Sequence, residues 1–93
     1  MEKNSEIYNK IGQKIKKYRK NKKLTQIELA QILGISLSYL SKIEAKNCHK
    51  SFSLDLLVSI AKTLEVDIRD FFFFFYFNTS SKAPSSINLV VNK

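Results

Sequence analysis

The first apolar pattern in the chain has the spacing of an amphipathic helix. Its apolar residues recur at intervals of four, four and three, and so share one face of a helix whose remaining surface is rich in lysine. These residues are Ile7, Ile11, Ile15 and Tyr18. Gly12 lies inside the stretch, and a glycine within a helix costs about 1 kcal/mol relative to alanine. The pattern predicts a helix here, with a glycine that marks either a close contact or a tolerated weakness.

Two short helices are predicted next, each beginning at a capping residue. Thr25 and Glu28 have the spacing of a capping box, in which each side chain satisfies a backbone N–H of the other residue. Gly34 ends this helix, because glycine adopts the left-handed conformation without a steric penalty. Ser36 is the cap of the following helix. The sequence therefore predicts two short helices joined by a tight turn.

A further apolar pattern follows a polar connection at residues 45–52. Ser53 is a helix cap, and apolar positions with helical spacing come after it. These positions are Leu54, Leu57, Ile60, Ala61 and Leu64. Asp67 and Asp70 frame a short fifth helix, since acidic residues stabilise the first turn of a helix. We expect the compact domain to close near Phe72.

Charge is distributed unevenly along the 93 residues. Of the net charge of +8, the first 23 residues carry +7, from nine basic and two acidic side chains. A concentrated positive potential attracts polyanions, so nucleic acid is the first candidate partner and an anionic membrane surface the second. The longest apolar run, residues 71–77, is far shorter than the roughly 20 residues of a membrane-spanning helix. We therefore expect no membrane span.

The residue set offers little for catalysis or metal binding. Cys48 and His49 are the only cysteine and histidine, too few for a tetrahedral metal shell. No nucleophile with a base, paired carboxylates or glycine-rich phosphate loop occurs at a working spacing. We expect no enzymatic activity, no cofactor and no metal. The single cysteine and the absence of a secretory signal indicate a cytoplasmic protein.

The two capped short helices resemble the XRE family of bacterial and phage regulators, typified by the lambda-type repressors and Cro. The matching stretches are Leu24-Thr25-Gln26, Glu28-Leu29-Ala30, Leu33-Gly34-Ile35-Ser36 and Tyr39-Leu40-Ser41-Lys42-Ile43-Glu44. The resemblance implies an all-α fold, a five-helix lambda-repressor-like DNA-binding domain at residues 1–72. It also implies that helix 26–33 crosses the DNA backbone while helix 36–44 enters the major groove.

By this resemblance, the start of helix 36–44 supplies the base contacts. The candidate base-contacting residues are Ser36, Leu37, Ser38 and Lys42. Their chemistry suits the task, because lysine donates to guanine, serine pairs with several base edges and leucine can touch a thymine methyl group.

Phosphate contacts are expected around these helices. Gln26 matches the family position that binds a phosphate at a helix N-terminus. The other candidates are Tyr39, Lys46, Asn47, Lys22 and Lys23, for which the alternative is a solvated surface role. Arg19 and Glu44 match a structural ion pair of several family members; the alternative for Arg19 is a phosphate contact.

Residues 73–93 form an aromatic and polar C-terminal extension. Seven successive aromatic residues cannot all face inward, so we expect a dimer interface formed by Phe71, Phe72, Phe73, Phe74 and Phe75. The alternatives are an edge strand paired with residues 87–91, an aggregation-prone or disordered tail, and a frameshift product.

The function expected from these features is a transcriptional regulator that binds double-stranded DNA sequence-specifically, as a repressor or autoregulator. A homodimer would bind a near-palindromic operator. The alternative is a protein-binding antitoxin or adaptor subunit that carries a helix-turn-helix domain.

Overall fold

The computed structural model describes residues 4–47 and 50–73 of the chain. This part forms four α-helices, α1 (Asn4–Asn21), α2 (Gln26–Leu33), α3 (Leu37–Glu44) and α4 (Leu54–Leu64), followed by a 3₁₀ helix, η1 (Ile68–Phe72). No strand occurs among the described residues, so the all-α prediction is confirmed there. The fifth element is a 3₁₀ helix rather than an α-helix, and the strand considered at residues 87–91 lies outside the described residues.

Local capping signals define where the helices begin and end. Thr25 and Glu28 form a reciprocal capping box, with N–H···O distances of 2.8 and 3.0 Å. Gly34 ends α2 in the left-handed conformation at φ 72°. The hydroxyls of Ser36 and Ser53 accept hydrogen bonds from the first turns of α3 and α4. These caps were predicted from the sequence and are confirmed.

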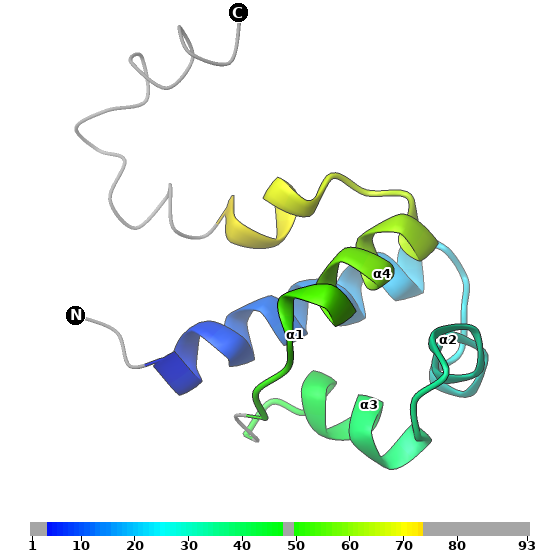
Figure 1. The fold of residues 1–93 in the computed structure, drawn as a ribbon, viewed down its shortest axis with the longest axis horizontal. Coiled ribbons are helices and arrows are strands. Elements are labelled where there is room, and N and C mark those ends of the chain that lie inside the picture. Colours follow the sequence, from blue (N-terminus) through cyan, green and yellow to red (C-terminus); the bar gives the residue numbers. More distant parts are fainter. Residues whose placement is uncertain (1–3, 48–49, 74–93) are drawn as a thin grey trace, which may run out of the picture.

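The helices surround one apolar core. Helix α1 packs against α3, α4 and η1, while α2 packs against α3 and α4. Figure 1 shows α4 crossing in front of α1, with α3 below α1 in the same view. The fully buried side chains at the centre of the core include Ile15, Leu29, Leu40, Ile43, Ile60 and Phe71. This core leaves the outer side of α3 to solvent.

Gly12 is the point of closest approach between α1 and α3. A Cβ atom placed on Gly12 would overlap the backbone carbonyl oxygen of Ile43. Of the two interpretations of this glycine, a close contact is the correct one. The missing side chain allows the backbone of α3 to lie directly on α1.

Phe71 belongs to the core. Its side chain has no exposed surface and stacks edge-on against Tyr18, with ring centroids 5.7 Å apart. The prediction that Phe71 contributes to a dimer interface is therefore wrong, because this ring already fills the space between α1 and η1. Phe72 is half-buried and Phe73 is 43% exposed. Phe74 and Phe75 lie outside the described residues.

Within the described residues, no helix is long and apolar enough to cross a membrane.

Candidate nucleic-acid interface

Helix α3 has one side fixed in the core and one side open to solvent. Leu40, Ile43 and Glu44 are at most 1% exposed and anchor the inner side. The four residues predicted to contact bases are all exposed, namely Ser36, Leu37, Ser38 and Lys42. The only carboxylate of α3 is the buried Glu44. The open side of α3 therefore presents small hydroxyls, one apolar side chain and one ammonium group.

Arg19 and Glu44 form a buried ion pair between α1 and α3. The guanidinium donates from Nε to Oε2 and from Nη2 to Oε1, both at 2.9 Å. Its Nη1 donates to the carbonyl of Leu24 at 2.7 Å. The fork geometry of arginine suits a carboxylate, and all three guanidinium nitrogens are engaged within the protein. The ion pair expected from the family resemblance is thus present in the structure.

Two polar residues of α1 cap the C-terminal end of α3. Asn9 Nδ2 donates to the carbonyl of Ala45, and Gln13 Nε2 donates to the carbonyl of Glu44, each at 2.9 Å. The last carbonyls of a helix have no partner within the helix, so these amides satisfy them. Sequence reasoning missed both residues. The available signal was two amide side chains four residues apart, on either side of Gly12.

Gln26, the first residue of α2, directs its side chain toward α3. Its Nε2 donates to Glu44 Oε1, and its Oε1 accepts from Ser41 Oγ, both at 3.0 Å. Sequence reasoning placed this side chain on a DNA phosphate, whereas here it is hydrogen-bonded within the domain. Ser41 was given no role in the site from the sequence.

Tyr39 connects α3 to the loop that leads into α4. Its hydroxyl donates to the carbonyl of Ser51 at 3.2 Å, and Lys50 Nζ lies 5.7 Å from the ring centroid. Lys46 and Asn47 follow α3 directly and are exposed. Lys46 and Asn47 therefore lie at the C-terminal end of α3, while Ser36 and Tyr39 lie at its N-terminal end.

Lys22 and Lys23 lie in the connection between α1 and α2. Lys22 forms an exposed ion pair with Glu65, the residue that caps the C-terminus of α4. The hydrogen bond from Lys22, reinforced by its charge, lowers the pKa of the Glu65 carboxyl. Lys23 is exposed and adopts a left-handed backbone with φ 63°. Neither lysine lies on α3, and Lys22 is paired with the carboxylate of Glu65.

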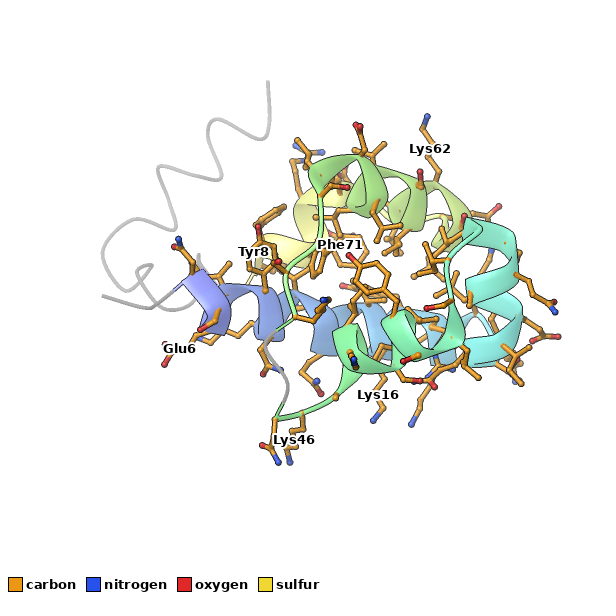
Figure 2. All side chains as sticks on the ribbon, turned by 60° about the horizontal axis from the view of Figure 1, so that its bottom comes forward. Glu6, Tyr8, Lys16, Lys46, Lys62 and Phe71 are labelled. Atoms are coloured by element: carbon orange, nitrogen blue, oxygen red, sulfur yellow. The ribbon has the colours of Figure 1, made fainter. Side chains whose placement is uncertain are left out.

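The charged side chains project from different sides of the domain. Figure 2 shows Lys16 and Lys46 on the side where α3 lies, and Lys62 on the opposite side. Phe71 points into the interior in the same view. The surface around α3 therefore combines an exposed helix face with lysines from neighbouring segments.

Two short helices joined at Gly34, the second with an exposed outer side, define a helix-turn-helix protein. The chain belongs to the helix-turn-helix family, whose model matches residues 15–71, and it is of the XRE type predicted from the sequence.

Curated relatives are bacterial and phage regulators. The HTH-type transcriptional regulator SinR of Bacillus subtilis is 41% identical over 58 residues, covering 62% of this chain and 51% of SinR. SlrR of Bacillus subtilis, also an HTH-type transcriptional regulator, is 42% identical over 62 residues, covering 67% of this chain and 40% of SlrR. The immunity repressor protein of Bacillus phage phi105 is 40% identical over 58 residues, covering 62% and 39% of the two chains. This chain thus matches about half or less of each relative.

A similar solved structure is the crystal structure of the restriction-modification controller protein C.AhdI from Aeromonas hydrophila. It superposes with a TM-score of 0.61 at 28% identity, covering 69% of this chain and 94% of the controller protein. The similarity extends over nearly the whole fold of that protein.

Proposed function

We propose that this chain is a cytoplasmic transcriptional regulator that binds double-stranded DNA sequence-specifically and reads the major groove with α3. The observation that carries the proposal is the exposed outer side of a helix whose inner side is locked in the core. An α-helix fits the major groove, and a rigidly held helix can read it in one register. The relatives are named as transcriptional regulators and a repressor, which supports repression or autoregulation as the outcome.

Base recognition is assigned to the first turns of α3. Lys42 donates to guanine O6 and N7, Ser36 and Ser38 pair with base edges, and Leu37, 42% exposed, contacts a thymine methyl group. The buried position of Glu44 supports this assignment, because an exposed carboxylate would repel the phosphates on either side of the groove.

Phosphate contacts are assigned to segments that flank α3. The N-terminus of α2 offers backbone N–H groups and the positive end of the helix dipole. Lys46 and Asn47 follow α3, and the Tyr39 hydroxyl lies against the backbone of Ser51 in the same connection to α4. Lys22 and Lys23 add positive charge at the connection before α2. Such contacts supply affinity and register, while base contacts supply specificity.

Selection of bound duplexes from a random pool, followed by gel-shift titrations at several salt concentrations, tests the proposal. We expect one preferred sequence, a steep loss of affinity with salt, and weaker binding when a preferred base pair is changed. Equal affinity for all duplexes would contradict sequence-specific recognition.

The proposed regulator binds a near-palindromic operator as a homodimer, with residues 1–72 as the DNA-binding domain and residues 73–93 as an extension that contributes to the dimer. Apolar surface near the start of the extension supports this arrangement. A cavity of about 270 Å³ is lined by Ile7, Tyr8, Leu54 and Phe72, among others. Leu54 is 65% exposed, and Phe73, the next residue after Phe72, is 43% exposed. Exposed apolar patches commonly mark interfaces.

The same apolar surface favours a second candidate function, a protein-binding antitoxin or adaptor subunit. Under this alternative the surface binds a different protein, and α3 has a secondary role. A monomeric protein in solution that shows no preferred duplex after selection would favour the alternative. A dimer with a preferred palindromic site would favour the regulator.

A further inference from the structure

Gln26 connects the first turn of α2 to two positions on α3. Its Nε2 donates to Glu44 Oε1, and its Oε1 accepts from the hydroxyl of Ser41, both at 3.0 Å. Ser41 and Glu44 are three residues apart and therefore share one side of α3. A single amide group thus spans nearly one turn of the helix that we propose to read DNA.

The direction of both hydrogen bonds follows from the groups involved. The carboxylate of Glu44, paired with the guanidinium of Arg19, can only accept, so the amide must present Nε2 to it. This turns Oε1 toward Ser41, whose hydroxyl must then donate. Because Arg19 also holds both oxygens of Glu44 from α1, the carboxylate is a fixed reference point. The two bonds of Gln26 therefore constrain both the distance and the angle between α2 and α3.

Burial strengthens this constraint. Glu44 is 1% exposed and Arg19 is 7% exposed, while Gln26 and Ser41 are half-buried. Hydrogen bonds shielded from water are stronger electrostatically and polarise one another along a chain. Lys42 is the residue next to Ser41, so a rotation of α3 at Ser41 would also move Lys42.

We infer that Gln26 is a positioning residue for base recognition, which acts through Ser41 and Glu44 rather than by donating its side-chain amide to a phosphate. The inference rests on the proposed DNA-binding function and deepens it. The phosphate contact at this end of α2 then falls to the backbone N–H groups of its first turn. Ser41, which points to Gln26, becomes a specificity residue without contacting a base.

A double-mutant cycle tests the inference. Dissociation constants are measured for the full chain and for Gln26→Ala, Ser41→Ala and the double variant, each on the selected duplex and on a random duplex. We expect each single change to lower the ratio of selected to random affinity by about fivefold, the loss expected for one hydrogen bond to a partly buried partner. The double variant should lose little more than Gln26→Ala alone, because both changes remove the same link.

Ser38→Ala is the matched control, since it removes an exposed hydroxyl from the same helix. The effects of Ser38→Ala and Gln26→Ala should multiply, as expected for independent sites. Ser41→Thr keeps the hydroxyl and should retain the selectivity of the parent chain. If Gln26→Ala does not fold, as judged by its melting curve, the contrast between Ser41→Ala and Ser41→Thr decides the question, and equal selectivity of these two variants would overturn the inference.

Other outcomes separate the inference from the proposal beneath it. A side chain bound to phosphate would make Gln26→Ala weaken selected and random duplexes by the same factor, with Ser41→Ala unchanged. Independent effects of Gln26→Ala and Ser41→Ala would likewise overturn the positioning role. If the parent chain prefers no duplex, the proposed function fails, and the inference fails with it.

Discussion

Gly12 of α1 lies directly against the backbone carbonyl of Ile43 in α3, and a Cβ atom at position 12 would overlap that oxygen. The neighbouring Gln13 donates to the carbonyl of Glu44, and Asn9, one turn earlier, donates to the carbonyl of Ala45. The C-terminal end of α3 is therefore held against α1 by this backbone contact and two amide hydrogen bonds, in addition to the Arg19–Glu44 ion pair. These contacts hold the proposed recognition helix from the side opposite to its exposed face.

Gly12→Ala should destabilise the fold by about 1–3 kcal/mol, the range for inserting a methyl group into a packed interior. Alanine gains about 1 kcal/mol in helix propensity, but a carbonyl inside a helix cannot turn away from the new methyl group. Urea unfolding measures the difference. Lys20→Ala, at an exposed position of the same helix, is the control and should change stability by less than about 0.5 kcal/mol. A Gly12→Ala protein as stable as the parent chain would argue against the close contact.

Glu44→Ala should cost about 3–5 kcal/mol, because it leaves the buried guanidinium of Arg19 without its carboxylate. Arg19→Ala should have a similar cost for the converse reason. The double variant Arg19→Met/Glu44→Met should be more stable than either single variant, since it leaves no unpaired buried charge. Thermal unfolding of the three proteins checks the order. A double variant less stable than both single variants would show that the two side chains do not act as a pair.

Features that depend on short stretches of sequence were predictable. The capping box of Thr25 and Glu28, the left-handed Gly34 and the cap at Ser36 each involve residues at most three positions apart, and each is present. The Arg19–Glu44 pair was expected only through the family resemblance. Its partners are 25 residues apart, and helical periodicity alone does not bring them together.

Features that depend on how the helices meet were not predictable. The partners of Gln26, at 15 and 18 residues' separation, follow from the crossing of α2 and α3, and nothing in the local pattern distinguishes them from a phosphate. Phe71 was assigned to a surface because all rings of the aromatic run have similar chemistry, so the pattern does not show which of them face the core. The η1 turn places Phe71 inward and Phe73 outward. The DNA-contacting roles of the exposed residues remain predictions.

Asp67 should give the protein a distinct loss of stability in acid. Hydrogen bonds from the Arg69 side chain and backbone lower the pKa of Asp67 from 3.8 to about 2. A depressed folded-state pKa stabilises the protein above the unfolded pKa, and this contribution is lost as the pH falls from about 4 toward 2. Asp67→Asn retains a capping group without the titration. The difference in urea midpoint between the two proteins should shrink over this range, and parallel curves would contradict the assignment.

Leu54→Glu and Phe73→Glu should each convert the proposed dimer into a monomer, because both place a charge on exposed apolar surface near the start of the extension. Sedimentation velocity measures the change. Ile32→Glu, which charges an apolar residue of α2 that is 58% exposed, is the matched control and should leave the mass unchanged. Affinity for a palindromic duplex should fall in the monomeric variants, while affinity for one half-site should stay the same. A parent chain that is monomeric at tens of micromolar would exclude this interface.

Lys42 and Lys46 should differ in the kind of DNA contact they make, although both are exposed lysines within or just after α3. Lys42→Ala should cost about 1–3 kcal/mol on the selected duplex and relax the preference at one base pair. Lys46→Ala should weaken all duplexes by a similar factor and reduce the slope of log affinity against log salt by about 1, because one phosphate contact is lost. Lys62→Ala, on the opposite side of the domain in Figure 2, should change neither quantity. Repeating the duplex selection with each variant separates the two roles. Only Lys42→Ala should return an altered consensus sequence. An altered consensus with Lys46→Ala would instead assign base reading to the end of α3.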